Sequence, residues 1–372
     1  MRYRPGRVHV LSLVALAVVG LALLAIAERS MSPIVQPHFA EKMEAATKAR
    51  HAIDVIRSTR LGMGGEIDIV NDPNETGVIG HEFTLITTDR GWRGAKQRAL
   101  DPNLAAVFVE LLKRARVGEG DRVAVGVTGA FPLLNASAII ATEVVGAEPV
   151  VITSVGSSMW GATDPELTWL DMETALTEAA VVSHRSIAAS IGGGGDVGRG
   201  LSPEGRDLIV AAIERNGVEL VRESTLDGSI EARMAVFRRE SGGERYDAYI
   251  NVGGGLASVG SGQVAKLVRP GLTKALSMRD LPRRGVLVRM ADEGVPVIHV
   301  PDADRLIERY GLMPPSEEPG PLPEVGVGEV FAQERYNAPL AATLAVLYGF
   351  LIFVVVRIDI KHYVFRRRGV ET

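Results

Sequence analysis

The stretch from Asp121 to Gly161 constrains the fold of this chain more than any other. A short apolar run at Val123–Val127 precedes a segment with a helical pattern, Pro132–Val145, and a second β-rich run follows at Pro149–Val155. A strand, a helix of about four turns and another strand form a βαβ unit with parallel strands. The loops that follow two such strands lie at one edge of the sheet, where ligands usually bind.

Strand and helix candidates alternate from about residue 82 to residue 310. This alternation predicts an α/β fold with a mainly parallel sheet and flanking helices. The other strand candidates are Ile67–Val70, Glu82–Thr88, Val181–Ser190, Val218–Arg222, Tyr246–Val252, Val286–Met290 and Val295–Val300. The other helix candidates are Glu41–Arg60, Asp101–Arg116, Asp164–Ala180, Ser202–Asn216, Ile230–Arg239 and Ser261–Val268.

Two uncharged apolar segments flank this region: Val8–Ala27, of 20 residues, and Pro339–Val356, of 18 residues. About 20 apolar residues cross a bilayer as a helix. Basic residues lie before the first segment, at positions 2, 4 and 7, and after the second, at 357, 361 and 366–368. The positive-inside rule therefore places both termini in the cytoplasm. We expect an exported domain held in the cell (inner) membrane by N- and C-terminal transmembrane helices.

Ala25-Ile26-Ala27 also has the small-residue pattern of a signal-peptidase site, so cleavage after Ala27 stays open. An uncleaved anchor is favoured, because the apolar run is longer than the usual core of about 7–15 residues in a signal peptide. The predicted organisation is a cytoplasmic tail (1–7), a transmembrane helix (8–27), a juxtamembrane helix region (28–60), an extracytoplasmic α/β domain (61–313), a Pro/Gly-rich linker (314–338), a transmembrane helix (339–356) and a basic cytoplasmic tail (357–372). The helix in 28–60 either packs on the domain or self-associates near the membrane.

Composition excludes several classes of function. The chain has no cysteine, which excludes disulfides, thiolate metal sites and cysteine nucleophiles. Its net charge is −4, and no basic stripe interleaved with aromatic residues is present, so we do not expect it to bind nucleic acid. We expect no cofactor and no bound metal.

The loops after the strands contain the candidate binding residues. Thr128 and Gly129 follow the first strand of the βαβ unit, and Ser157 and Ser158 follow the second. Gly253-Gly254-Gly255 follows another strand candidate, where glycines let backbone N–H groups approach an anion. We expect these residues to share a pocket suited to carboxylate groups. Tight turns that need glycine are the simpler explanation of the Gly253–Gly255 run.

A catalytic interpretation uses the same loop. Ser157 or Ser158 as nucleophile, with His184 and one of Asp164 and Asp171, would make a Ser-His-Asp constellation. The G-x-S-x-G motif that usually presents such a serine is incomplete here.

Carboxylates cluster just after this loop, at Asp164, Glu166, Asp171 and Glu173. With Asp196 they could hold a divalent cation. A solvated acidic helix start, favoured by the helix dipole, is the stronger interpretation.

Three sequence strings resemble one bacterial family, the poly-gamma-glutamate system proteins. They are GVTGAFPLLNASA (126–138), SVGSSMWGATDPELTWLDME (154–173) and SIGGGGD (190–196), and HEFTLITTDRGWRGAKQRALDPNLAA (81–106) is similar as well. The resemblance covers about residues 60–260 and includes the N-terminal membrane segment. It supplies no catalytic residues that could be transferred to this chain.

The resemblance implies a role in the biosynthesis or export of poly-γ-glutamate, an anionic polymer. Its implied partners are the synthase components, a membrane protein and an amide ligase, and the polymer itself. Three hypotheses stay open. The resemblance favours a non-catalytic accessory that binds polymer or partners. The polar, glycine-rich loops after the strands favour an extracytoplasmic serine hydrolase or transferase acting on γ-glutamyl bonds, and the third hypothesis is a small-ligand or cation sensor. A basic groove near the Gly253–Gly255 turn would favour the accessory, and a base within hydrogen-bond reach of a serine hydroxyl would favour the enzyme.

Overall fold

The structure is a computed structural model that describes residues 10–276 and 283–357. The chain forms two compact units, which are described separately. Unit 1 consists of the residues up to Val35 and those from Ala332 onwards, and unit 2 is Gln36–Phe331.

Unit 1 contains two long apolar helices and a short two-stranded sheet. The helices are α1 (Val10–Arg29) and α13 (Ala338–Arg357), and strand β1 (Ser32–Val35) pairs antiparallel with β11 (Ala332–Arg335). Both helices are long and apolar enough to cross a membrane. They correspond to the two predicted apolar segments, apart from Val8 and His9, which lie outside the described residues.

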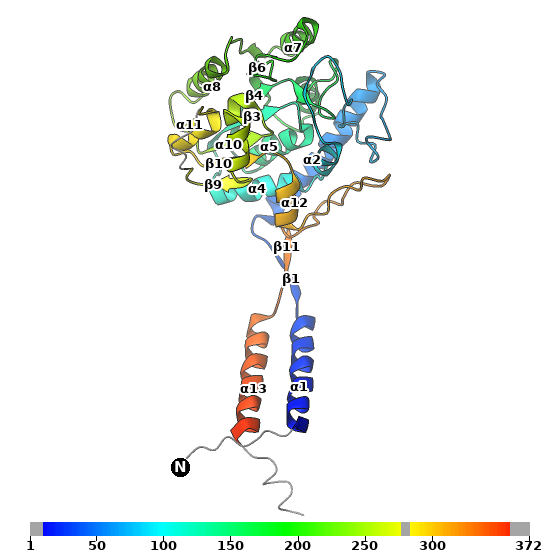
Figure 1. The fold of residues 1–372 in the computed structure, drawn as a ribbon, viewed down its shortest axis with the longest axis vertical. Coiled ribbons are helices and arrows are strands. Elements are labelled where there is room, and N and C mark those ends of the chain that lie inside the picture. Colours follow the sequence, from blue (N-terminus) through cyan, green and yellow to red (C-terminus); the bar gives the residue numbers. More distant parts are fainter. Residues whose placement is uncertain (1–9, 277–282, 358–372) are drawn as a thin grey trace, which may run out of the picture. The chain divides into compact units, whose positions relative to one another are not determined.

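The two helices of unit 1 lie side by side (Figure 1). The Tyr348 hydroxyl donates a hydrogen bond to the Leu16 carbonyl at 3.1 Å. A Cβ atom at Gly20 would lie 2.7 Å from that hydroxyl, so the glycine leaves the space that the tyrosine ring occupies. Small residues of this kind let apolar helices approach closely in a membrane.

Unit 2 is built on a seven-stranded sheet with the strand order β7-β6-β4-β3-β8-β10-β9. All neighbouring strands are parallel except β9 and β10, which are antiparallel. The predicted α/β class with a mostly parallel sheet is therefore confirmed. The strands are β3 (Arg122–Thr128), β4 (Glu148–Ser154), β6 (Ser186–Ser190), β7 (Glu219–Leu220), β8 (Ala248–Val252), β9 (Gly271–Thr273) and β10 (Val297–Val300).

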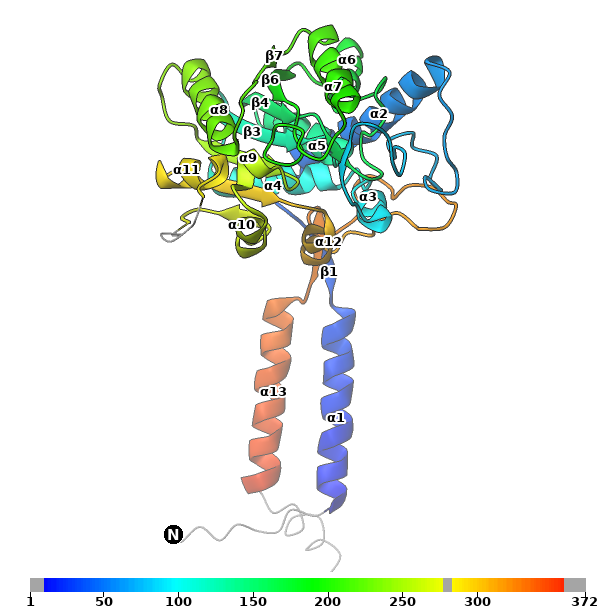
Figure 2. The same cartoon turned by 45° about the horizontal axis from the view of Figure 1, so that its top comes forward.

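Helices cover both faces of this sheet (Figure 1). The first face carries α2 (Phe39–Gly62), α4 (Leu104–Ala115), α5 (Pro132–Val144), α6 (Trp169–Glu178) and α7 (Pro203–Arg215), of which α6 and α7 are neighbours (Figure 2). The second face carries α8 (Leu226–Glu240), α9 (Leu256–Val259), α10 (Gly262–Leu267) and α11 (Val286–Asp292). The short helices α3 (Arg93–Arg98) and α12 (Asp304–Tyr310) complete the unit, together with a two-stranded sheet of β2 (Thr87–Asp89) and β5 (Ser157–Ser158).

Side chains of the central strands alternate between two apolar clusters. Val123 and Val125 of β3 belong to the cluster on the first face, whereas Ala124 between them belongs to the cluster on the second face. Tyr249 and Ile250 of β8 divide in the same way. Successive side chains of a strand point to opposite faces, and a sheet covered on both faces needs apolar residues at every position. This explains why these strands are continuously apolar in the sequence.

Three strand predictions were wrong in whole or in part. Val286–Met290 forms the first residues of helix α11, whose buried side chains pack in the second cluster. Ile67–Val70 is not a strand, and only the last two residues of Glu82–Thr88 belong to one, β2. Short apolar runs do not distinguish a buried strand from one face of a buried helix, and packing decides between them.

Helix α2 belongs to the core of unit 2. Ala45, Ala49 and Ile53 are among its fully buried residues and lie in the first cluster. The helix contacts α4 and α5. The folded unit therefore begins before this helix, at Gln36, and not at the predicted boundary at residue 61.

The Pro/Gly-rich stretch after residue 313 is attached to unit 2. Residues 314–328 have no regular secondary structure, as their composition predicts. However, Asn103 donates a hydrogen bond to the Glu324 carbonyl at 2.8 Å and accepts one from the Gly326 N–H at 2.9 Å. Phe331, which follows, is buried. The stretch therefore runs along the folded unit, and does not connect to it as a free linker.

Candidate functional site

The order of the strands places a topological switch point between β3 and β8. The chain runs from β3 to β4, β6 and β7 on one side, and then returns to place β8 on the other side of β3. Ligands of open α/β sheets bind beyond the carboxyl ends of the strands at such a point. Here the two loops are Thr128–Phe131 and Gly253–Gly255, which we call the switch-point loops.

The structure brings three of the predicted binding residues together at the switch-point loops. A Cβ atom at Gly253 would lie 2.6 Å from the Thr128 hydroxyl, and one at Gly255 would lie 2.9 Å from the Thr128 methyl group. Gly253 also has φ +82°, a backbone conformation that side chains disfavour. Gly254 is exposed, and a Cβ atom added there would have no neighbour within 4 Å. The two loops are thus in contact, with an open backbone segment at Gly254.

The two predicted serines, in the loop after β4, have different surroundings. Ser157 is fully buried, and its hydroxyl donates to the carbonyls of Gly129, at 3.0 Å, and Ser158, at 2.8 Å. Ser157 thereby ties the loop to Gly129, so it is a structural residue. Ser158 is only partly buried, and its Oγ lies 2.8 Å from the Nζ of Lys96 on α3. Sequence reasoning did not identify Lys96.

The predicted histidine is not part of this arrangement. His184 precedes β6, at the amino edge of the sheet, whereas Ser158 follows β4 at the carboxyl edge. The Nδ1 atom of His184 lies 2.8 Å from a carboxylate oxygen of Glu143, at the end of α5. The same oxygen accepts the backbone N–H of His184 at 2.8 Å. His184 therefore fixes a turn and does not serve either serine.

A buried ion pair lies behind the carboxyl ends of β4 and β6. Arg233 of α8 is 3.2 Å from Asp196, and both are buried. The same guanidinium donates to the hydroxyls of Ser154 at 2.8 Å and Ser190 at 2.6 Å, the last residues of these two strands. Ser229 also hydrogen-bonds Asp196. Asp196 is held by Arg233, Ser154 and Ser229, so it anchors its glycine-rich loop.

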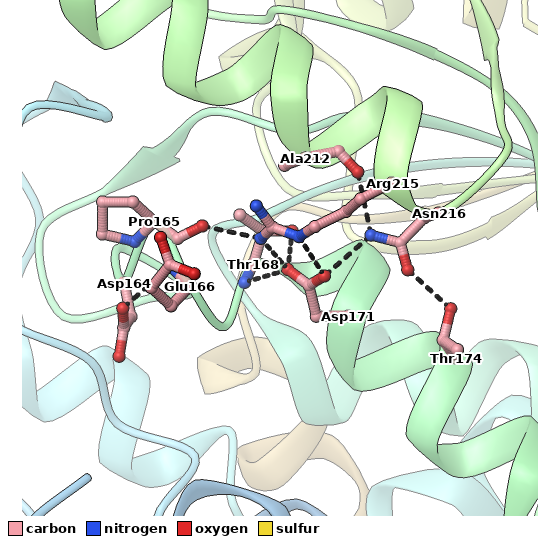
Figure 3. Close-up of polar contacts among 9 residues, drawn as sticks. All are labelled: Asp164, Pro165, Glu166, Thr168, Asp171, Thr174, Ala212, Arg215 and Asn216. Carbon is pink, nitrogen blue, oxygen red and sulfur yellow. Dashed lines mark hydrogen bonds and ion pairs between the residues drawn. The ribbon is translucent and has the colours of Figure 1, made fainter. Parts of the chain in front are cut away.

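Asp171, one of the clustered carboxylates, is engaged by its neighbours (Figure 3). Arg215 of α7 binds it with two nitrogens, at 2.8 and 2.6 Å, and Asn216 donates at 2.7 Å. The backbone N–H of Thr168 donates at 2.7 Å, which completes a capping box at the start of α6. Helix α6 consequently begins at Trp169, so the prediction of a helix start at Asp164 was wrong.

The other clustered carboxylates have separate partners. Asp164 lies 3.4 Å from Arg60, and Glu173 accepts the Ser186 backbone N–H at 2.8 Å. Asp196 is held by Arg233 as described above. Over residues 10–276 and 283–357, no three His, Asp or Glu side chains are grouped so that they could hold a metal ion. The carboxylates therefore do not form the cation site that the cation-sensor hypothesis needs.

A groove of about 600 Å³ lies between α10 and α12. It is lined by Lys266, Arg269, Pro270, Arg305, Glu308 and Arg309, and we call it the basic groove. The segments that form it are joined to the carboxyl edge of the sheet, because α12 follows β10 and residues 266–270 lead into β9 beside His299. All four cationic side chains are exposed. The sequence gives no periodic signal for this groove, because its two halves lie more than 30 residues apart.

Lys266, Arg269 and Arg309 form no ion pair with a carboxylate in the described part of the chain. Arg305 has one exposed contact with Glu308, at 3.6 Å. Exposed pairs of this kind contribute only about 0–1 kcal/mol, so Arg305 stays accessible to a ligand. The groove therefore presents four cations against one carboxylate, on a chain whose net charge is negative.

Three features of unit 2 are thus candidates for function: the switch-point loops, the Ser158–Lys96 contact and the basic groove. In three comparisons, no protein-family model, curated protein or solved structure matched the chain. Its function is consequently inferred from the chemistry of these three features.

Proposed function

We propose that this chain is a membrane-anchored accessory protein of poly-γ-glutamate biosynthesis or export, whose α/β unit binds the anionic polymer outside the cytoplasm. The basic groove is the observation that carries the proposal. Its four cationic side chains suit a ligand with closely spaced negative charges, because opposite charges attract and steer such a ligand to the surface. Poly-γ-glutamate carries a carboxylate on every unit.

The spacing of the cations supports binding of an extended chain. Arg305 and Arg309 are four residues apart on α12 and so lie on the same face of that helix. Lys266 and Arg269 line the opposite side of the groove. A polymer lying in the groove would have cations on both sides, so successive carboxylates can each meet a charge. The switch-point loops, with the Thr128 hydroxyl and the open backbone at Gly254, offer further donors at the same edge of the sheet.

The apolar helices support a place in the membrane. Helices α1 and α13 each have the length and composition of a membrane span, and they pack through Tyr348 and Gly20. Placement of unit 2 outside the cytoplasm rests on the basic residues at both ends of the chain. The resemblance to the poly-gamma-glutamate system proteins links this arrangement to the synthase, whose membrane protein and amide ligase are the proposed partners.

Binding of a fluorescent poly-γ-glutamate oligomer to the purified full-length chain in detergent tests the proposal. We expect saturable binding that weakens as salt is raised, because the charges of the groove are exposed. The double variant Lys266→Glu/Arg269→Glu should bind about tenfold more weakly or worse, a change of about 1.4 kcal/mol. The matched control is Arg222→Glu/Arg245→Glu, which reverses two exposed arginines outside the groove.

Two results would contradict the proposal. One is equal binding by the groove variant and the control variant. The other is binding to vesicles of anionic lipid with no binding of the polymer, which would make the groove a membrane-contact surface.

A further inference from the structure

The contact between Lys96 and Ser158 has the geometry of a base and a nucleophile. The Lys96 Nζ donates to the Ser158 Oγ at 2.8 Å and to the Ala130 carbonyl at 2.7 Å. Lys96 is 5% exposed, so its position is fixed by packing, whereas Ser158 is partly open to solvent. A nucleophile within about 2.6–3.2 Å of its base, with the base oriented by a third group, is the pattern of activated serine enzymes.

The surroundings of Lys96 favour its neutral amine. Burial lowers the pKa of Lys96 to about 7, and no charged side chain contributes to this shift. The Phe131 ring centroid lies 4.0 Å from its Nζ, a cation–π contact that favours the charged form and acts against the effect of burial. Lys96 lines a small apolar cavity of about 10 Å³, and it is the one titratable side chain among the lining residues. Asp89, which is in register with Ser158 on β2, is exposed and accepts the Arg90 N–H instead.

The turn that carries Ser158 is held firmly. Thr88 donates to the Ser157 carbonyl at 3.1 Å, and the Ser157 hydroxyl is bound to Gly129. Trp160, two residues after Ser158, has φ +67°, which is unfavourable for a residue with a side chain. A Cβ atom at Gly161 would lie 2.2 Å from the Ser157 hydroxyl, so only glycine fits there. Strain held by surrounding contacts is common at functional sites, where it fixes the position of a reacting group.

We propose that Ser158 and Lys96 form a serine–lysine acyl-transfer dyad that cleaves amide bonds, with Ser158 as nucleophile and Lys96 as general base. The neutral Lys96 amine takes the hydroxyl proton while Oγ attacks the amide carbonyl carbon. The carbon–nitrogen bond then breaks, and the leaving amine receives the proton from Lys96. Water hydrolyses the resulting Ser158 ester with the same base, which releases a carboxylic acid and restores the hydroxyl group.

A γ-glutamyl amide is the substrate class that this site would take. This assignment rests on the proposed function, because the polymer bound by the basic groove consists of such amides. The dyad itself rests on the geometry around Ser158 and does not depend on the groove. The substrate must approach Ser158 from its solvent-exposed side, since the cavity beside Lys96 is no larger than about one water molecule.

Labelling of the full-length chain in detergent with a fluorophosphonate probe, followed by peptide mass spectrometry, tests the dyad. We expect the label on Ser158, at a rate that rises with pH around a midpoint of about 7 as Lys96 loses its proton. Ser158→Ala should abolish labelling, and Lys96→Met should slow it about 100-fold or more, the usual minimum contribution of a general base. The control Ser58→Ala, at an exposed serine on α2, should label like the original chain.

Thermal melting of each variant separates loss of the base from loss of the fold. If Lys96→Met does not fold, the pH profile of the original chain and the folded Ser158→Ala variant still decide the result. The dyad is wrong if Ser158 stays unlabelled from pH 6 to pH 9 in folded protein, or if a folded Lys96→Met variant labels at the original rate.

Gel analysis of poly-γ-glutamate incubated with the chain tests the substrate class. Shortening of the polymer that is lost in Ser158→Ala supports it, whereas a labelled Ser158 with polymer of unchanged length contradicts it. Normal polymer cleavage at low salt by Lys266→Glu/Arg269→Glu would show that the dyad acts without the basic groove. Failure of the dyad can therefore be distinguished from failure of polymer binding in the groove.

Discussion

The Nζ atom of Lys96 lies 2.8 Å from the Oγ atom of Ser158, although 62 residues separate the two in the chain. Helix α3 supplies the lysine, and the turn after β4 supplies the serine. The contact gives Ser158 a potential base that is not a histidine. His184, which a Ser-His-Asp arrangement would require, instead binds Glu143.

Loss of Arg233 should destabilise unit 2 strongly. Arg233→Met would leave Asp196 buried without its cation, and breaking a buried pair in this way costs about 3–5 kcal/mol. The double variant Arg233→Met/Asp196→Asn should recover part of this loss, because the uncompensated charge is removed. Urea denaturation of the full-length chain measures both free energies of unfolding. Equal stability of the single variant and the original chain would show that the pair does not hold the Asp196 loop.

Stability should fall between about pH 4.5 and pH 7 because of Glu173. Burial raises the pKa of this carboxyl group from 4.5 to about 7. In that range the unfolded chain is ionised at Glu173 and the folded chain is protonated, so the stabilisation present below pH 4.5 is lost as pH rises through about 7. A shift of this size corresponds to up to about 3 kcal/mol.

Comparison of Glu173→Gln with Glu178→Gln isolates this effect. Glu178 is exposed on the same helix, so its replacement should leave the pH dependence of the melting temperature unchanged. In Glu173→Gln, the fall in melting temperature between about pH 4.5 and pH 7 should be smaller by at least a few degrees. About 1 kcal/mol shifts the melting temperature of a large domain by a few degrees. An unchanged decline in Glu173→Gln would mean that this carboxyl group is ionised in the folded chain.

The membrane topology can be mapped with reporter fusions. A fusion after Arg366, which lies outside the described residues, should report the cytoplasm because of the surrounding basic residues. A fusion within residues 314–328 should report the exterior, and short insertions there must keep the Asn103 contacts that attach this stretch to unit 2. A cytoplasmic signal from the second fusion would reverse the proposed placement of unit 2.

The fold was largely predictable because its central strands are visible in the sequence as short apolar runs. The run at Val123–Val127, the Pro132 helix start and the run before Ser154 all lie where the sequence places them, since a buried parallel strand needs continuous apolar residues. Val286–Met290 is also mostly apolar, yet it packs as a short helix against the second face. Local pattern contains too little information to separate these two outcomes.

The candidate sites were only partly predictable. The rule that loops after parallel strands share an edge correctly joins Thr128 to Gly253 and Gly129 to Ser157. It says nothing about Lys96, which lies on a six-residue helix outside the βαβ unit, or about the cations of α10 and α12. Such contacts depend on how distant segments pack, and no periodicity in the sequence reports them.

The most direct test of the proposed function is the amount of poly-γ-glutamate made by cells that lack this chain. Deletion should reduce cell-bound and extracellular polymer, and complementation with the original chain or with Arg222→Glu/Arg245→Glu should restore both. Complementation with Lys266→Glu/Arg269→Glu, expressed at the same level, should fail to restore them. Unchanged polymer in the deletion strain, or full restoration by the groove variant, would contradict the account.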